Sequence, residues 1–411
     1  MTDSTDPDGL APIDLPIARE CPFDPPAELG RIRDEHPICP LHYPDDHLGW
    51  LVSNYHLGRA LLGDSRFSVR HPHLVIGDGY QNARLEDLVD REHPEMRVGN
   101  LLEVDPPEHV RLRRLQAGYF TVQRVAEYRE DIEEIVSDRL DAFEAVGSPV
   151  DFVKEFAYPV PSLALCSMLG IPAEDRERFE RPTAEVADFG TTADERIGPL
   201  RELFDYAKRV VDRKRARPTG DIISELIQGG QMTDDEIVGA TSFIFSAGHE
   251  TTATMFGFAA FALLSDRSRW EYLLANPERI DNAVEELLRY LTIFHVGAVP
   301  RTATEDLEFE GVRIKKGANV TVSLAGANRD PLQYPEPDVL DLDRDTGRHL
   351  AFGSGRHICL GQHLARLELQ IGFRALTERF PTLRLAVGTD RVPMRPFDVG
   401  AYGVDSLPVE W

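Results

Sequence analysis

The strongest constraint on the fold lies between Thr233 and Leu264, where a helix start signal precedes a long apolar run. The tetrapeptide Thr233-Asp-Asp-Glu236 has the form of a capping box, in which each end residue's side chain bonds to the other residue's backbone N–H. The apolar residues that follow continue to about Leu264. At 1.5 Å per residue, a helix of about thirty residues is roughly 45 Å long, which exceeds most helices of globular proteins. This segment therefore favours a large, mainly helical fold.

Helical signals dominate the whole stretch from Asp105 to Leu291. The sequence DPPE at 105–108 predicts a helix start with Asp105 as N-cap and an acidic residue three positions later. Asn276-Pro277 predicts another start. The apolar residues on the buried side of that helix are Ile280, Val284, Leu287, Leu288 and Leu291. Near the C-terminus, a further helix is predicted from the shared face of Leu360, Leu364, Leu367 and Ile371.

Strand signals are few and short. Gly49–Val52 is a strand candidate, followed by a helix in residues 54–62. The alternating pattern of residues 306–324, broken at Gly311 and at a Lys316-Gly317 turn, predicts hairpin strands. No low-complexity tract, repeat or long linker divides residues 1–411, so we expect a single domain that is mainly α (α+β). Residues 1–26 are predicted to form an extended arm, and Arg70–Asn100 to form a long, partly irregular loop.

Charge and cysteine content exclude several classes of function. The chain has 45 basic and 70 acidic residues, a net charge of -25, which disfavours binding to nucleic acid or anionic lipid. Its four cysteines have no CxxC spacing, so neither a disulfide framework nor a zinc ribbon is indicated. The first residues lack the regions of a signal peptide, and no apolar run approaches the ~20 residues of a membrane span. We therefore expect a soluble, cytoplasmic protein, and a monomer.

The most informative segment for function is FGSGRHICLG, residues Phe352–Gly361. Its three glycines permit close backbone approach and positive φ angles. Cys359 lies at the mouth of the following helix, where the helix dipole and free N–H groups favour a thiolate. Such a thiolate is a ligand for iron or a nucleophile. A structural Cys remains an alternative, as does a zinc site built from His349, His357, Cys359 and His363.

The same segment resembles the haem-ligand signature FGxGxHxCxG of cytochromes P450. The matched positions are Phe352, Gly353, Gly355, His357, Cys359 and Gly361. The resemblance implies that Cys359 is the axial ligand of haem b iron, and that Phe352, Gly353 and Gly361 border the cofactor. It also implies the P450 fold, a triangular helical prism with a small β-sheet region. Matches extend from about Gly49 to the C-terminus, as in soluble actinobacterial P450s of specialised metabolism.

A second match lies within the long apolar segment, at Ala247-Gly-His-Glu-Thr-Thr252. Glycine is unfavourable inside a helix and Thr hydroxyls bond back to the preceding turn, so a local kink is predicted here. A kink of packing origin with a solvated Glu250 is the alternative. The segment resembles the P450 motif (A/G)Gx(D/E)T. That resemblance implies that Ala247 and Gly248 border the haem, and that Glu250 and Thr251 deliver the protons needed to cleave the O–O bond.

Two sets of charged residues complete the resemblance. His109 and Arg113 share one helix face and resemble the P450 segment that reaches the haem propionates; Arg301 and His357 match the other contributors. Without that context, His109 and Arg113 would be a solvated basic face. Glu286 and Arg289 form an ExxR pair, which alone is common and weak. In the family this pair binds an Arg before the Cys loop, for which Arg344 is the candidate, and its role is structural.

The resemblance implies a monooxygenase that uses O2 to hydroxylate or epoxidise a hydrophobic small molecule, such as a macrolide or terpenoid natural product. Electrons would come from a ferredoxin and its NAD(P)H-dependent reductase. The ferredoxin would dock on a local basic patch near the Cys loop, for which the candidate residues are Arg111, Arg114, Arg348, Arg356 and Arg366. Substrate contacts are expected from the loop Leu74–Leu101 and from Phe243, Ser246, Ala247, Phe294, Val296 and Gly297. Oxidative ring closure or coupling is an alternative, as is a non-catalytic haem protein.

Overall fold

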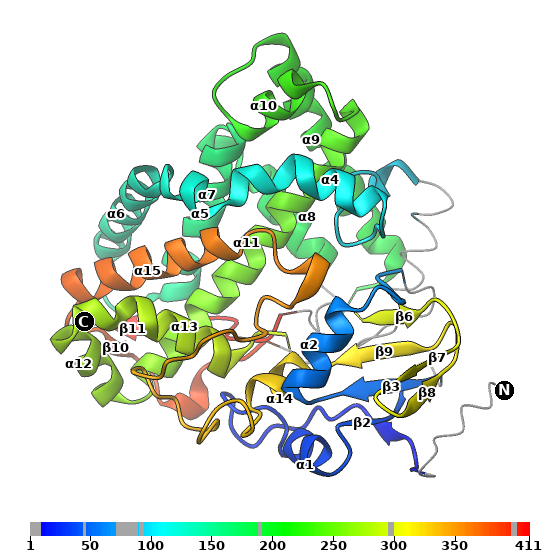
Figure 1. Ribbon diagram of the computed structural model, residues 1–411. Coiled ribbons are helices and arrows are strands. Elements are labelled where there is room, and N and C mark those ends of the chain that lie inside the picture. Colours follow the sequence, from blue (N-terminus) through cyan, green and yellow to red (C-terminus); the bar gives the residue numbers. More distant parts are fainter. Residues whose placement is uncertain are drawn as a thin grey trace.

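The computed structural model describes residues 10–43, 47–70, 89, 94–187, 191–294, 300–395 and 401–411. Helices make up most of it, and Figure 1 shows them covering the left and upper parts of a triangular outline. The helices are α1 (Ala27–Glu35), α2 (Tyr55–Gly63), α4 (Glu108–Ala117), α5 (Val122–Ala126), α6 (Arg129–Val146), α7 (Pro159–Leu169), α8 (Glu177–Ala187), α9 (Ala193–Ala216), α10 (Ile222–Gly229), α11 (Asp234–Leu264), α12 (Arg267–Ala275), α13 (Ile280–Leu291), α14 (Leu324–Asn328) and α15 (Gln362–Arg379). The expected mainly α class with a minor sheet component is confirmed.

The strands form three small sheets, the largest at the lower right of Figure 1. They are β1 (Ile13–Asp14), β2 (Ile38–His42), β3 (Leu48–Val52), β4 (Phe67–Ser68), β5 (Val150–Asp151), β6 (Arg301–Ala303), β7 (Leu307–Phe309), β8 (Val312–Ile314), β9 (Asn319–Val322), β10 (Arg384–Leu385) and β11 (Pro408–Glu410). The six-stranded sheet has the order β1-β2-β3-β9-β6-β4, with β1–β2 and β3–β9 parallel and the other pairs antiparallel. A three-stranded sheet has the order β10-β11-β5, and β7 pairs with β8.

Helix α11 runs through the centre of the helical core. The predicted capping box is present: the Thr233 hydroxyl accepts from Glu236 N at 3.2 Å, and the Glu236 carboxylate accepts from Thr233 N at 2.8 Å. Most α11 side chains are buried, and the helix contacts α7, α8, α9, α12, α13 and α15. A helix that is apolar on nearly all sides must be surrounded in this way. The described chain contains no helix with the length and apolarity needed to cross a bilayer.

Several local predictions need correction. Asp105 does not cap α4, because its carboxylate instead accepts from the Ser68 hydroxyl and from Val69 N at 3.1 Å. Strands β7 and β8 form the predicted hairpin around Gly311, which has a φ of 86°. The strand after Gly317, however, leaves the hairpin and pairs with β3 and β6. Leu360 precedes α15 instead of sharing its face.

The N-terminal segment packs onto the rest of the molecule. In residues 10–26, β1 adds to the edge of the largest sheet, and the Phe23 ring lies 4.7 Å from the Phe261 ring of α11. The Phe23 carbonyl also accepts a hydrogen bond of 3.1 Å from Arg329. The segment that was predicted as an extended arm therefore contributes to both the sheet and the core, while residues 1–9 lie outside the described chain.

Candidate functional site

A cavity of about 360 Å³ lies between α11 and the loop before α15, and it brings together most of the predicted site. The predicted residues that line it are Arg113, Phe243, Ala247, Gly248, Thr251, Phe294, Arg301, Phe352, Gly353, His357, Cys359 and Gly361. Much of the remaining lining is apolar and includes Leu101, Leu102, Leu165, Ile244 and Ile293. Cys359 and the Ala247–Thr251 turn thus border one largely apolar space.

Three of the described residues that were expected to contact the haem or the substrate, or to deliver protons, do not line the cavity, and others lie outside the described chain. The Ser246 hydroxyl donates to the Phe243 carbonyl at 3.3 Å, so it bonds to the preceding turn of its own helix. His109 and Glu250 also lie outside the cavity lining: the His109 ring packs against His357, and the Glu250 carboxylate pairs with Arg395. Val296 and Gly297 fall in residues 295–299, which the structure does not describe. The same holds for most of the Leu74–Leu101 loop, although its last residue, Leu101, does line the cavity.

The three glycines of the Cys loop differ in whether backbone conformation or space requires glycine. Gly353 and Gly355 have φ angles of 72° and 74°, a region that disfavours other residues. A Cβ on Gly355 would also lie 2.4 Å from the Leu62 carbonyl oxygen, so the loop approaches α2 closely. Gly361 has an ordinary φ of -85° and open space beside it, so neither a positive φ nor a close backbone approach requires glycine at this position. Its missing side chain instead leaves room in the cavity.

Cys359 faces the cavity and is exposed there, although protein surrounds the rest of the residue. Its backbone N–H donates to the Phe352 carbonyl at 2.9 Å, which fixes the loop next to the sulfur. Burial raises the pKa of the Cys359 thiol, while the N–H groups of Gly361 and Gln362 and the charges of Arg113 and Arg366 oppose that rise. The expected stabilisation of a thiolate by the start of α15 is thus present, but burial outweighs it in the protein alone. A metal ion bound to the sulfur would stabilise the thiolate further.

Four cationic or imidazole side chains gather beside Cys359. The rings of His109 and His357 are 3.9 Å apart, and burial lowers the pKa of His109 to about 4 and of His357 to about 3. Within the described chain, both ring nitrogens of His109 and Nε2 of His357 are buried without a hydrogen-bond partner. Arg113 donates to the Ile358 carbonyl at 2.6 Å, and burial lowers the pKa of Arg301 to about 10. Buried donors of this kind suit two carboxylates, so the residues fit the propionates of a haem.

On α11, the hydroxyl of Thr251 lies at the cavity and donates to the Ala247 carbonyl at 2.6 Å. The predicted bond from a Thr hydroxyl back to the preceding turn is therefore present, and the helix continues from Asp234 to Leu264 without interruption. Gly248 has a packing role: a Cβ there would lie 3.2 Å from the Leu165 side chain of α7.

Glu250 is neither solvated nor in the cavity. Its carboxylate forms an ion pair with Arg395, whose other nitrogen donates to the Thr254 hydroxyl at 2.9 Å. Sequence reasoning missed Arg395, and no local pattern could have found it, because it lies 145 positions from Glu250 in the chain.

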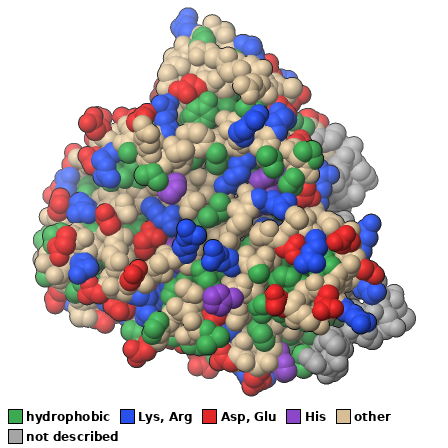
Figure 2. Space-filling model, viewed as in Figure 1, with side chains coloured by type: hydrophobic (Ala, Val, Ile, Leu, Met, Phe, Trp, Pro, Cys, Tyr) green, Lys and Arg blue, Asp and Glu red, His purple; other side chains and the backbone are tan. Residues whose placement is uncertain are grey.

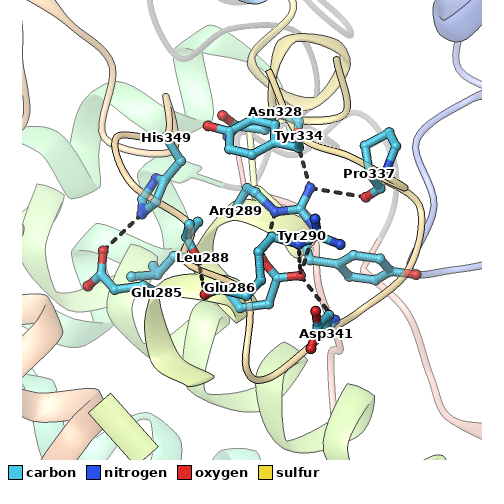
Figure 3. A network of polar contacts seen from close by, with 12 residues as sticks. Glu285, Glu286, Leu288, Arg289, Tyr290, Asn328, Tyr334, Pro337, Asp341 and His349 are labelled. Carbon is cyan, nitrogen blue, oxygen red and sulfur yellow. Dashed lines mark hydrogen bonds and ion pairs between the residues drawn. The ribbon is translucent and has the colours of Figure 1, made fainter. Parts of the chain in front are cut away.

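Glu286 and Arg289 meet in a buried network, shown in Figure 3. Arg289 binds the Glu286 carboxylate through two nitrogens, at 2.7 and 2.8 Å, and both side chains are 0% exposed. Arg344 donates to the same carboxylate at 3.1 Å, as does the backbone N–H of Asp341. Arg289 also donates to the carbonyls of Asn328 and Pro337. Loss of either partner would leave a buried charge without a counterion, which is strongly unfavourable. The network therefore holds α13 against the segment before the Cys loop.

The zinc alternative finds no support in the described chain, where no group of three or more His, Cys, Asp or Glu side chains could hold a metal ion. The Nε2 atom of His349 lies 3.2 Å from the Glu285 carboxylate instead of near Cys359. Sequence reasoning did not single out Glu285, although it directly precedes the ExxR glutamate.

Comparisons with known proteins all point in one direction. Residues 274–396 match the family model described as Cytochrome P450. Cytochrome P450 105C1 of a Streptomyces species is 40% identical over 98% of this chain and 99% of its own length. The 20-oxo-5-O-mycaminosyltylactone 23-monooxygenase of Streptomyces fradiae is 36% identical over 98% of this chain and 93% of its own. The crystal structure of CYP105P1 in complex with filipin I matches with a TM-score of 0.89 and 38% identity, covering 98% of this chain and 99% of that one.

Proposed function

Because this chain belongs to the cytochrome P450 family, and is a haem b-dependent monooxygenase with the P450 fold, we propose that it hydroxylates or epoxidises a hydrophobic natural product. The observation that carries the proposal is that Cys359, Thr251 and mainly apolar side chains border the same cavity. A haem held there by Cys359 would supply the activation of O2, with the thiolate favouring O–O cleavage.

Each polar residue around the cavity then has a task. His109, His357, Arg113 and Arg301 would hold the propionates, because they are buried or half-buried donors beside the Cys loop. The Thr251 hydroxyl would hold a proton at the cavity wall. Glu250 would supply that proton from behind the wall, where Arg395 keeps its carboxylate in place. Thr251 lines the cavity and Glu250 does not, so a proton passing from the acid to the hydroxyl would move through a bridging water.

The apolar lining supports a substrate without charge near the reacting carbon. Leu101, Leu102, Leu165, Phe243 and Phe294 offer contact area but no ionic partner. One similar protein is named as a monooxygenase of 20-oxo-5-O-mycaminosyltylactone, and another was solved in complex with filipin I. We infer that this enzyme also oxidises a natural product of that size class or of the terpenoid class.

We further infer that electrons arrive from a ferredoxin and its NAD(P)H-dependent reductase. Figure 2 shows Lys and Arg side chains gathered near the centre of the face that carries α2, α4 and α15, with acidic side chains more frequent toward its edges. Arg114 and Arg348 are exposed, and Arg356 is half-buried. Arg111 and Arg366 already pair with Glu236 and Glu285, so they are weaker docking candidates than the sequence suggested. A local positive field can steer an acidic ferredoxin despite the net charge of -25.

The decisive experiment is the absorption spectrum of the purified holoprotein, reduced with dithionite, with and without carbon monoxide. We expect the strongly red-shifted Soret band of a thiolate-ligated haem, and its loss in Cys359→Ala. A histidine-type band in fresh protein would refute Cys359 as ligand. Turnover with ferredoxin, reductase and isotopically labelled O2 then distinguishes the alternatives. Label in the product supports hydroxylation or epoxidation, an unlabelled oxidised product indicates ring closure or coupling, and no turnover indicates a non-catalytic haem protein.

A further inference from the structure

Glu285, on α13, connects the two ends of the Cys loop. Its carboxylate accepts two hydrogen bonds from Arg366, from Nε at 2.6 Å and from Nη2 at 3.1 Å, and it lies 3.2 Å from Nε2 of His349. His349 precedes Cys359 by ten positions and Arg366 follows it by seven. One carboxylate therefore holds both the segment that enters the loop and the helix that leaves it.

The hydrogen bond at the second ring nitrogen of His349 indicates where the ring proton lies. Nδ1 accepts a hydrogen bond of 3.2 Å from the backbone N–H of Ala351, so it carries no proton. The ring proton must then lie on Nε2, from which it is donated to Glu285. His349 is accordingly a neutral donor, and Arg366 is the cation of the group.

These two partners of Glu285 also contact Phe352, the first residue of the Cys loop motif. The Arg366 guanidinium lies 4.5 Å from the centre of the Phe352 ring, and the His349 ring lies 5.9 Å from it. The carbonyl of Phe352 accepts the N–H of Cys359 at 2.9 Å. A continuous chain of contacts thus runs from the Glu285 carboxylate through Phe352 to the backbone of Cys359.

Glu285 and Glu286 are neighbours with separate tasks. Figure 3 shows their carboxylates directed to different partners, Glu285 toward His349 and Glu286 toward Arg289. Hydrogen bonds from His349 and Arg366 outweigh burial and lower the pKa of Glu285 to about 2, so the carboxylate is charged at neutral pH. That charge offsets the charge of Arg366, which acts on the Cys359 thiolate.

We propose that Glu285 is a positioning residue for the thiolate: by holding His349 and Arg366 against Phe352, and by offsetting the charge of Arg366, it sets the reduction potential of the bound haem. The inference rests on the proposed ligation of haem by Cys359. Groups that contact a metal ligand without binding the metal tune the metal centre through the orientation and charge around that ligand. A nearby positive charge favours the ferrous form, and a negative charge favours the ferric form.

The test is a spectroelectrochemical titration of the holoprotein, with the carbon monoxide spectrum recorded for each variant. Glu285→Gln leaves Arg366 unopposed and should shift the potential to more positive values. Arg366→Gln should shift it to more negative values, and the double variant should lie near the wild type. Glu271→Gln removes the acid of another Glu–Arg pair, with Arg267 on α12, and should leave the potential unchanged.

The outcomes separate the two proposals. A wild type without the thiolate Soret band would refute ligation by Cys359, and the positioning role with it. A normal wild-type band would leave the proposed function standing. In that case, two single variants that shift the potential in the same direction, or that do not shift it, would overturn the role of Glu285 alone. If Glu285→Gln fails to bind haem, Arg366→Gln and Arg366→Lys decide, because only the first should lower the potential.

Discussion

Arg395 controls the surroundings of Glu250 from outside α11. It pairs with the Glu250 carboxylate and donates to Thr254, and the Arg395 and Glu250 side chains are only 14% and 16% exposed. The carboxylate that we propose as a proton donor is therefore held by an ion pair that shields it from most of the solvent. Removing the cation would leave a largely buried carboxylate without its charged partner.

We predict that Arg395→Met lowers the free energy of unfolding by about 1–3 kcal/mol, less than the 3–5 kcal/mol of a fully buried pair because the site is partly exposed. The double variant Glu250→Gln/Arg395→Met should recover part of that loss, since it removes the stranded charge. Urea unfolding of the wild type, both single variants and the double variant measures the coupling. Additive losses in the double variant would show that the ion pair does not matter for stability.

His249 is a buried residue outside the cavity lining whose titration should couple to folding. It is 1% exposed, its ring nitrogens have no hydrogen-bond partner within the described chain, and burial lowers its pKa to about 4. The unfolded chain therefore binds more protons than the folded chain between the unfolded pKa, about 6.5, and about 4. The stabilising contribution is complete above pH 6.5 and is lost as the pH falls through this window.

We expect His249→Leu to weaken the fall in stability on acidification. The free energy of unfolding of both proteins, measured from pH 7.5 to 4.5, checks this through its slope, because leucine has no proton to bind. Equal slopes in the two proteins would mean that His249 is not the group that titrates. The comparison depends on slopes, so a constant packing cost of the substitution does not affect it.

At the scale of elements, glycines determine how closely α11 packs against its neighbours. A Cβ on Gly239 would lie 1.7 Å from the carbonyl oxygen of Val98, and a Cβ on Gly99 would lie 2.3 Å from that of Glu236. The two backbones are thus in direct contact. This contact also places the following residues, Leu101 and Leu102, at the cavity.

Gly239→Ala should displace the segment around Val98, because a backbone oxygen cannot move aside as a side chain can. We predict a loss of about 1–3 kcal/mol in stability, typical of overpacking, and a weaker spin-state shift on substrate binding. Gly118→Ala is the matched control, since Gly118 has helical angles and nothing within 4 Å of its Cβ position. The control should be neutral or stabilising by up to about 1 kcal/mol. A Gly239→Ala protein as stable as this control would contradict the packing argument.

At the scale of the whole molecule, the distribution of charge matters more than its sum. A chain with a net charge of -25 repels an acidic partner at long range, and salt screens both this repulsion and any local attraction. Docking of the ferredoxin that we propose would therefore depend on Arg residues near the Cys loop, because only charges close to a contact escape most of the screening by salt.

We predict that the double variant Arg114→Glu/Arg348→Glu lowers the rate of ferredoxin-supported reduction at least several-fold at low salt, with little change in the carbon monoxide spectrum after dithionite reduction. Stopped-flow reduction at several salt concentrations measures this, and the difference from the wild type should shrink as salt rises. Lys208→Glu, an exposed charge reversal on α9, is the control. A double variant that is reduced as fast as the control would place the docking site elsewhere.

The sequence by itself determined features that depend on neighbouring residues. The Thr233–Glu236 capping box, the β7–β8 hairpin and the Glu286–Arg289 pair each form within a few positions, where helix or turn geometry alone brings the groups together. The Cys loop belongs here too, because the positive φ angles of Gly353 and Gly355 are local properties. Arg344 was predicted as a partner of this pair only from the resemblance to the P450 family, because no local pattern identifies it.

Only the tertiary structure decided which distant groups meet. Arg395 lies 145 positions from Glu250, and Arg366 lies 81 positions from Glu285. The same holds for the contact between Asp105 and Val69 and for the pairing of β9 with β3. Such contacts follow from how whole helices and strands pack, and the periodicity of a segment says which face is buried but not which partner it meets. The partners of charged side chains are the hardest to predict from sequence, because most charged side chains are solvated and no local sequence pattern identifies the few that are buried.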